Sequence, residues 1–235
     1  QAYSAAESSD YVEEEPAQRV TARRILERIE RHTTPGTLVD LGCWTGFFLD
    51  EAVRRGWSGV GVEPSEFAST YARERLGLDV RTSGLLDADL EPGSFDLAFM
   101  GDVIEHLVNP HAALVRIAGT LADGGLLALA LPDAGSRLAR AMGPRWWSVI
   151  PTHVQYFTRP SLATLLERSG FEVLAVSTAP KAFTVGYYLA RIGGYRPGLA
   201  RGLVRAATAL RLAERRWAPD FRDRMLVVAR LVATA

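Results

Sequence analysis

Two carboxylates and two imidazoles stand at positions where they could act together. Asp102, Glu105 and His106 follow an apolar run at i, i+3 and i+4, so one helical turn would place them on one face. His153 lies in a long connection after the next apolar run, so we expect it at the same edge. The four side chains predict a site for a divalent cation such as Mg²⁺ or Mn²⁺. In the alternative interpretation no metal binds, and His106 or His153 acts as a general base while Glu105 buttresses a neighbouring loop.

A glycine-rich turn between a strand and a helix is the second candidate site. Residues 38–47 read Leu-Val-Asp-Leu-Gly-Cys-Trp-Thr-Gly-Phe, and such glycines let the backbone approach a ligand at a helix N-terminus. Asp40, just before the turn, would repel a pyrophosphate but can accept from a ligand ammonium. Glu63 ends the next strand, 21 residues after Gly42, where ribose hydroxyls need an acceptor. The two acids favour a ligand with an ammonium and a ribose over a dinucleotide.

Alternating strands and helices must position these residues. We expect strands at 37–41, 58–62, 79–82, 95–101, 126–131, 171–178 and 225–232. We expect helices from Ala17 to before Pro35 and at 47–55, 65–76, 110–121 and 161–169, with Ser65 as an N-cap. This alternation predicts an α/β fold with a largely parallel sheet, whose strands have a ligand crevice at their carboxyl ends.

Three segments fall outside that alternation. Residues 1–16 are expected to form a flexible acidic arm, and residues 17–235 the folded domain. The connection 133–158 carries Trp146, Trp147 and His153, and the mostly helical segment 181–223 separates two strands that a tight hairpin could have joined. Connections of this length are usually functional or disordered, so we expect both to shape an acceptor site.

Composition narrows the function classes. The 235 residues are 48% hydrophobic with a formal net charge of zero, which argues against an electrostatic nucleic-acid binder. The single cysteine, Cys43, excludes an internal disulfide and fits a reducing compartment. The acidic start of the chain has no apolar signal region, and the apolar stretch 182–192 is too short to span a bilayer. The expected location is the cytoplasm.

From about residue 17 onward the chain resembles the class I S-adenosylmethionine (SAM) dependent methyltransferases. The resemblance rests on the turn 40–46, on Ser94-Phe-Asp-Leu-Ala-Phe99 and on Leu121-Ala-Asp-Gly-Gly-Leu126. It implies a Rossmann-like seven-stranded sheet in the order 3-2-1-4-5-7-6, with the last strand antiparallel and helices on both faces. It also implies SAM as cofactor and S-adenosylhomocysteine (SAH) as product.

The resemblance assigns roles to individual residues. The turn would wrap the methionine part of SAM, Glu63 would bind the ribose, and Gly84-Leu85 would flank the adenine. Many relatives carry an Asp near Gly84, and this chain does not. The implied cofactor contacts are Asp40, Gly42, Cys43, Trp44, Gly46, Glu63, Pro64, Gly84, Leu85 and Gly101. We expect acceptor contacts from Tyr11, Trp146, Trp147 and Tyr156, next to catalytic Glu105, His106 and His153. In the alternative interpretation, the two tryptophans only cover the core.

The two histidines tilt the expected reaction toward an oxygen acceptor, because a hydroxyl must lose a proton during transfer and an amine need not. Similar acid-x-x-Glu-His strings ligate a metal in ubiquinone-pathway and small-RNA 2′-O-methyltransferases. We expect a small-molecule or glycan acceptor with a sugar hydroxyl favoured, and no nucleic acid partner. The alternatives are a quinone or polyketide O-methyltransferase, an RNA 2′-O-methyltransferase and a non-catalytic SAM-binding protein. The arginine-rich segment 181–223 is a candidate homodimer interface.

Overall fold

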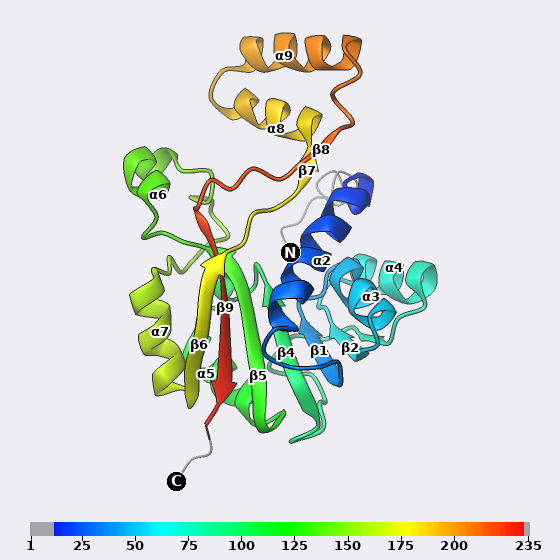
Figure 1. Ribbon diagram of the computed structural model, residues 1–235, viewed down its shortest axis with the longest axis vertical. Coiled ribbons are helices and arrows are strands. Elements are labelled where there is room, and N and C mark those ends of the chain that lie inside the picture. Colours follow the sequence, from blue (N-terminus) through cyan, green and yellow to red (C-terminus); the bar gives the residue numbers. More distant parts are fainter. Residues whose placement is uncertain (1–11, 233–235) are drawn as a thin grey trace.

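The computed structural model describes residues 12–232, and a mixed sheet runs through its centre (Figure 1). The strand order is β3-β2-β1-β4-β5-β9-β6, and β9 runs antiparallel to both β5 and β6. The strands are β1 (Thr37–Leu41), β2 (Ser58–Val62), β3 (Val80–Arg81), β4 (Phe95–Gly101), β5 (Leu121–Pro132), β6 (Phe171–Thr178) and β9 (Arg224–Leu231). The predicted order and the antiparallel last strand are therefore confirmed.

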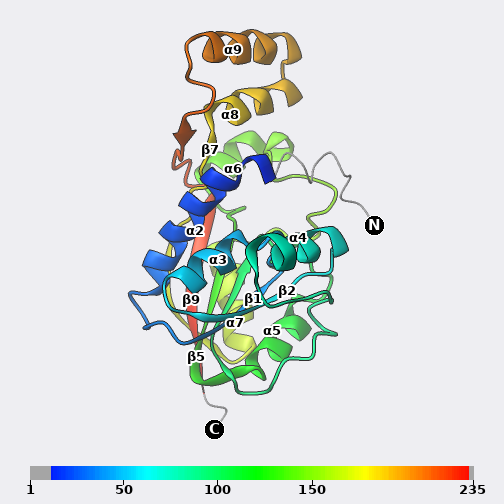
Figure 2. The same ribbon diagram turned by 90° about the vertical axis from the view of Figure 1, so that its right-hand side faces the viewer.

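Helices cover both faces of the sheet, as the two views show (Figures 1 and 2). One face carries α2 (Glu15–Ile29), α3 (Phe47–Arg54) and α4 (Glu66–Leu76), and the other carries α5 (Pro110–Ala118) and α7 (Arg159–Arg168). Leu26 and Leu49 are fully buried in the first layer, and Leu114 and Leu162 in the second. Because both faces are covered, the central strands read as continuous apolar runs.

Local sequence signals placed all strand boundaries of the central sheet except the start of β5 to within one residue. The helix expected at 110–121 ends at Ala118, and the helix expected from Ala17 begins inside the segment 1–16, which was expected to be a flexible arm. The strands at 37–41, 58–62, 95–101 and 171–178 have their predicted bounds, and the Ser65 hydroxyl caps α4 by accepting from Ala68 N at 3.3 Å. Strand β5 was predicted too short. Gly124 and Gly125, read as its boundary, lie inside it, and the β4–β5 register shifts between Phe95 and Leu97. The first helix begins at Glu15 because Pro16 fits its first turn.

The segment 181–223, here called the cap, stands beyond the carboxyl ends of the strands (top of Figure 1). It contains β7 (Phe183–Thr184), α8 (Val185–Arg191), η3 (Ile192–Gly194), α9 (Pro197–Ala209) and β8 (Arg216–Trp217), with β7 and β8 paired antiparallel. Its stems are close together because Thr178 pairs with Met225 across β6 and β9. The buried Glu14 carboxylate accepts from the Thr184 N–H and hydroxyl, which fastens α2 to the cap.

No helix within residues 12–232 combines the length and apolar character that a membrane span requires.

Candidate active site

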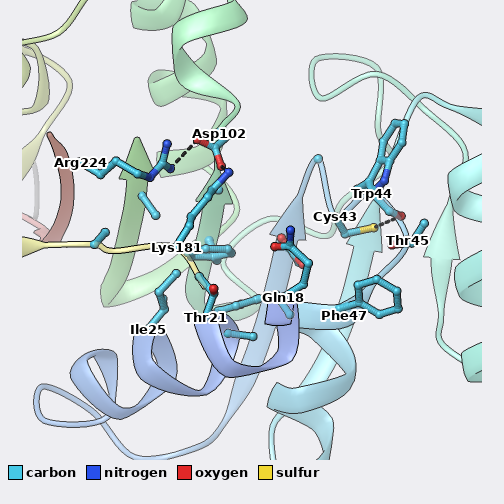
Figure 3. Close-up of a pocket in the computed structure, with 18 residues that line it drawn as sticks. Gln18, Thr21, Ile25, Cys43, Trp44, Thr45, Phe47, Asp102, Lys181 and Arg224 are labelled. Carbon is cyan, nitrogen blue, oxygen red and sulfur yellow. Dashed lines mark hydrogen bonds and ion pairs between the residues drawn. The ribbon is translucent and has the colours of Figure 1, made fainter. Parts of the chain in front are cut away.

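A pocket opens where the carboxyl ends of β1, β4 and β5 meet α2 and the two stems of the cap (Figure 3). Its wall includes the glycine-rich turn on one side and Lys181 and Arg224 on the other. The residues that line the pocket include Gln18, Thr21, Asp40, Gly42, Cys43, Trp44, Thr45, Gly101, Asp102, Lys181 and Arg224. The pocket lies at the edge where an open α/β sheet binds its ligands.

The glycine-rich turn needs its glycines for two separate reasons. Gly42 and Gly46 have φ of 75° and 83°, a left-handed conformation that costs glycine nothing. A Cβ at Gly42 would also come within 2.5 Å of Val103 Cγ2. Gly42 N and Cys43 N donate to Val62 O at 2.7 and 3.2 Å, which ties the turn to β2. The backbone is thereby held against the pocket at the start of α3.

The side chain of Asp40 is buried, and one of its carboxylate oxygens lacks a hydrogen-bond partner in the described chain. Asp40 is 1% exposed, and no residue of the described chain donates to its Oδ2 atom. Burial, together with the charge of Glu63, raises the pKa of Asp40 well above its usual value. The buried hydroxyl of Thr45 likewise has no hydrogen-bond partner among residues 12–232. A ligand ammonium at this wall would satisfy Asp40, as the sequence suggested.

Glu63 sits behind the turn, and it is not among the residues that line the pocket. Its carboxylate accepts from Trp44 N at 3.0 Å and from Ser65 N at 2.8 Å, while burial raises its pKa. Its remaining lone pairs are available to ribose hydroxyls. Pro64, Gly84 and Leu85 also lie outside the pocket wall, whereas Gly101 is part of it.

Glu105, His106 and His153 come together as the sequence predicted. One ligand atom from each lies within 4.8 Å of the others, and the two imidazole rings meet edge to face with centroids 4.6 Å apart. The 3₁₀ turn η1 (Ile104–His106) carries the first two residues. The third is held nearby because Val154 N and Gln155 N both donate to Glu105 O at 3.0 Å. These contacts bring the connection 133–158 against the end of β4.

The surroundings of Glu105 and His153 favour the uncharged forms of these two side chains. Glu105 is 2% exposed, and neither carboxylate oxygen has a hydrogen-bond partner in the described chain. Burial and the nearby charge of Asp102 raise the pKa of Glu105 to about 8. Burial and the neighbouring His106 lower the pKa of His153. A cation entering the cluster would therefore meet a carboxyl group with no competing partner.

Asp102 does not join that cluster, which corrects the predicted four-residue metal site. Its backbone is left-handed, with φ of 56°, so the helical turn begins after it and the expected shared face does not form. Its carboxylate instead pairs with Lys181 Nζ and Arg224 Nη2, each at 2.5 Å. Their charges hold the pKa of Asp102 far below its usual range, against the effect of burial. Asp102 is therefore already committed to two cations.

The predicted acceptor residues separate into different environments. Trp146 is 4% exposed, and its Nε1 donates to the buried Asp223 carboxylate at 3.1 Å. Trp147 is half-buried, and its ring lies 5.5 Å from that of Phe221 in the cap. Tyr156 is exposed, and Tyr11 lies outside the described residues. Trp147 is thus better placed than Trp146 to meet an acceptor.

Sequence reasoning missed Lys181 and Arg224. Lys181 is the only lysine in the chain and opens the cap, which is a signal that could have drawn attention to it. Arg224 is one of many arginines, and only the fold shows that it begins β9 beside Asp102. Gln18 and Thr21 were also missed, because the pattern of α2 showed only which face is apolar.

Residues 13–176 match a family described as a methyltransferase domain, which is well over half of the chain. The chain belongs to the class I SAM-dependent methyltransferases. The glycine-rich turn and the unpartnered Asp40 of this methyltransferase fit the cofactor that the family uses.

Curated relatives are similar to only part of this methyltransferase. A ubiquinone biosynthesis O-methyltransferase of Maricaulis maris is 30% identical over 153 residues, which are 59% of each chain. An uncharacterized methyltransferase of Mycobacterium sp. strain JLS is 36% identical over 101 residues, 41% of this chain and 40% of that protein. The matches span less than two thirds of these relatives, so they do not decide the acceptor.

Solved structures share the fold of the methyltransferase across almost its whole length. A Thermotoga maritima SAM-dependent methyltransferase, described as a possible histamine N-methyltransferase, has a TM-score of 0.63 and 23% identity, covering 95% of this chain and 94% of that one. A putative methyltransferase of Haloferax volcanii, solved with the Trm112 activator, has a TM-score of 0.70 and 17% identity, with 98% and 96% covered. At these identities the likeness concerns the fold alone.

Proposed function

We propose that this methyltransferase transfers the methyl group of SAM to a hydroxyl of a small molecule. The observation that carries the proposal is the cluster of Glu105, His106 and His153, whose first two members follow Asp102 of the pocket wall by three and four residues. When bound, SAM supplies the methyl group and a good leaving group. The chain must then orient the acceptor and deal with the hydroxyl proton, whose pKa is far above neutrality.

The imidazoles are placed to handle that proton. His106 Nδ1 lies 2.8 Å from Thr152 O, a carbonyl that can only accept, so Nδ1 carries the hydrogen in the neutral ring. Its Nε2 atom is then the proton acceptor. Because its surroundings lower the pKa of His153, that imidazole favours the uncharged form, which suits a base or a metal ligand.

A divalent cation held by the cluster is part of the proposal. The ligand atoms of Glu105, His106 and His153 are close enough to share one ion, and the Glu105 oxygens have no protein partner in residues 12–232. Two imidazoles with one carboxylate suit Mn²⁺ better than Mg²⁺. Such an ion would lower the pKa of an acceptor hydroxyl. Asp102 is not in the set, because Lys181 and Arg224 already occupy its carboxylate.

Two acceptor classes are proposed. A sugar or glycan hydroxyl remains the first, supported by the neighbouring aromatic side chains of half-buried Trp147 and exposed Phe221, on which a sugar ring can stack. A phenolic hydroxyl is the second, and the similarity to ubiquinone biosynthesis O-methyltransferases favours it. A homodimer through the cap is proposed as well, and sedimentation of the purified protein would test it.

Methyl transfer from labelled SAM to a panel of sugars, phenols and amines tests the proposal. We expect transfer to hydroxyls, loss of activity in EDTA and recovery with Mn²⁺. His106→Ala and His153→Ala should lower kcat by about 100-fold or more with unchanged SAH affinity. His111→Ala is the matched control, because that imidazole bonds to Ser169 away from the cluster.

The outcomes separate the parts of the proposal. Full activity in EDTA, rising with pH through a pKa of about 6–7, would replace the metal by a metal-free base and leave O-methylation standing. Transfer to amines alone would contradict O-methylation.

A further inference from the structure

Asp102, Lys181 and Arg224 form a charged cluster in the pocket wall that the proposed methyl transfer does not use. Asp102 follows β4, Lys181 opens the cap and Arg224 closes it at the start of β9. Figure 3 shows the Lys181 and Arg224 side chains converging on the Asp102 carboxylate from two sides. Both stems of the cap therefore deliver a cation to the same point of the pocket.

When Lys181 and Arg224 are protonated, the cluster carries one more positive than negative charge; burial lowers the pKa of Lys181, and the charge of Asp102 opposes that effect. Two cations face one carboxylate, and each of its oxygens contacts a different cation at 2.5 Å. Arg224 Nε is buried and has no hydrogen-bond partner among the described residues. Since a buried guanidinium N–H is costly to leave unpaired, an acceptor atom is expected to reach it. Lys181 still has ammonium protons to donate into the pocket.

We propose that Lys181 and Arg224 bind an anionic group, most simply a carboxylate, on the acceptor molecule. Asp102 holds the two cations in place until the acceptor arrives. The inference rests on the proposed function, and it narrows the acceptor to a hydroxy compound that also carries an acidic group. An Arg–carboxylate contact fixes orientation as well as position, so it would aim one hydroxyl of such a molecule at the transferred methyl group.

The carboxylate of SAM itself is the other possible occupant of the site formed by Lys181 and Arg224. Asp40, the proposed ammonium partner, pairs across β1 and β4 with Phe99. Asp102 lies three residues further along the chain, one residue past the end of β4, where the backbone is left-handed. Ammonium and carboxylate of SAM sit on the same carbon atom. Asp40, Lys181 and Arg224 line one pocket, so a comparison of SAH with decarboxylated SAH distinguishes the two occupants.

The test measures binding to protein saturated with SAH, so that it needs no turnover. Two matched pairs of probes are used in calorimetry: 3-hydroxybenzoate with 3-hydroxybenzamide, and glucuronate with glucuronamide. In each pair a carboxylate is replaced by a neutral amide of nearly the same shape, which has one acceptor oxygen fewer. We expect at least one acid to bind about tenfold or more tightly than its amide, as charged hydrogen bonds predict.

Three variants locate the effect. Lys181→Met should abolish the preference for the acid while leaving the Arg224–Asp102 pair intact. Asp102→Asn should increase the affinity for the acid, because it removes the competing carboxylate, and asparagine tolerates the left-handed backbone of that position. Arg201→Met, an exposed arginine on α9, is the matched control and should change nothing.

Equal binding of acid and amide in both pairs would overturn the inference. So would an unchanged preference in Lys181→Met. A third contrary result concerns the cofactor. If Lys181→Met binds SAH more weakly than the unmodified protein does, but binds decarboxylated SAH equally well, the cations contact the carboxylate of the cofactor and not the acceptor. If the acid binds as expected but no hydroxyl of any compound is methylated, the anion site stands and the proposed O-methylation fails.

Discussion

Residues 37–76, which carry the glycine-rich turn, and the cap differ in how they are built. In residues 37–76 the strands are short, the turn is locked to β2, and Asp40 and Glu63 are buried. The cap buries few side chains, among them Ala200, Ala207 and Ala213, and displays eight arginines between 191 and 222 against two acids. Residues 37–76 hold the turn and its buried acids by local backbone contacts, whereas the cap is joined to the sheet at its stems.

The largest expected effect concerns the attachment of the cap. Trp146→Ala removes a buried indole and its bond to Asp223, and we expect a loss of about 3–5 kcal/mol of unfolding free energy. Trp147→Ala serves as its neighbour control and should change the melting temperature little, while weakening acceptor binding. Denaturant unfolding measures the loss of stability in each variant, and the KM for the acceptor measures the loss of acceptor binding. Equal melting temperatures for the two variants would remove the distinction drawn between core and acceptor tryptophan.

The next largest effect concerns residues 37–76 and the affinity for SAH. Glu63→Ala deletes the acceptor for Trp44 N and Ser65 N, together with the proposed ribose contact. Calorimetry should show SAH affinity reduced by about 1–3 kcal/mol. The cap should not respond, so the acid-over-amide preference of SAH-saturated protein should persist. An unchanged SAH affinity would show that Glu63 only braces the turn.

The smallest effect is a proton release. Burial raises the pKa of Asp40, so its carboxyl is protonated over a wider pH range, and a bound ammonium would favour the ionised form. SAH binding should then release a proton to buffer, and its affinity should rise as the pH rises through that raised pKa. Asp40→Asn should bind about fivefold more weakly, with no proton release. Titrations in buffers of different ionisation enthalpy measure this directly. Identical release from the variant would assign the proton to another group.

The difference between residues 37–76 and the cap also explains which features could be predicted from the sequence. Strand bounds and the turn 40–46 follow from local apolar runs and glycines, and the resemblance to a known family added the strand order. Glu105, His106 and His153 were predicted together because carboxyl ends of parallel strands meet at one edge. The position of Asp102 could not be predicted, because it depends on a left-handed backbone and on cations far along the chain. Long-range ion pairs leave no periodic pattern in a sequence.

Strand β9 lies between β5 and β6 although it follows every other strand along the chain. During synthesis, β5 and β6 therefore emerge from the ribosome without the neighbour that later joins them. A nascent chain that ends within the cap would expose an open, apolar sheet edge on β5, which is a template for aggregation. Completion of the sheet waits for β9, so the rate at which the cap and β9 are translated should influence the yield of folded protein.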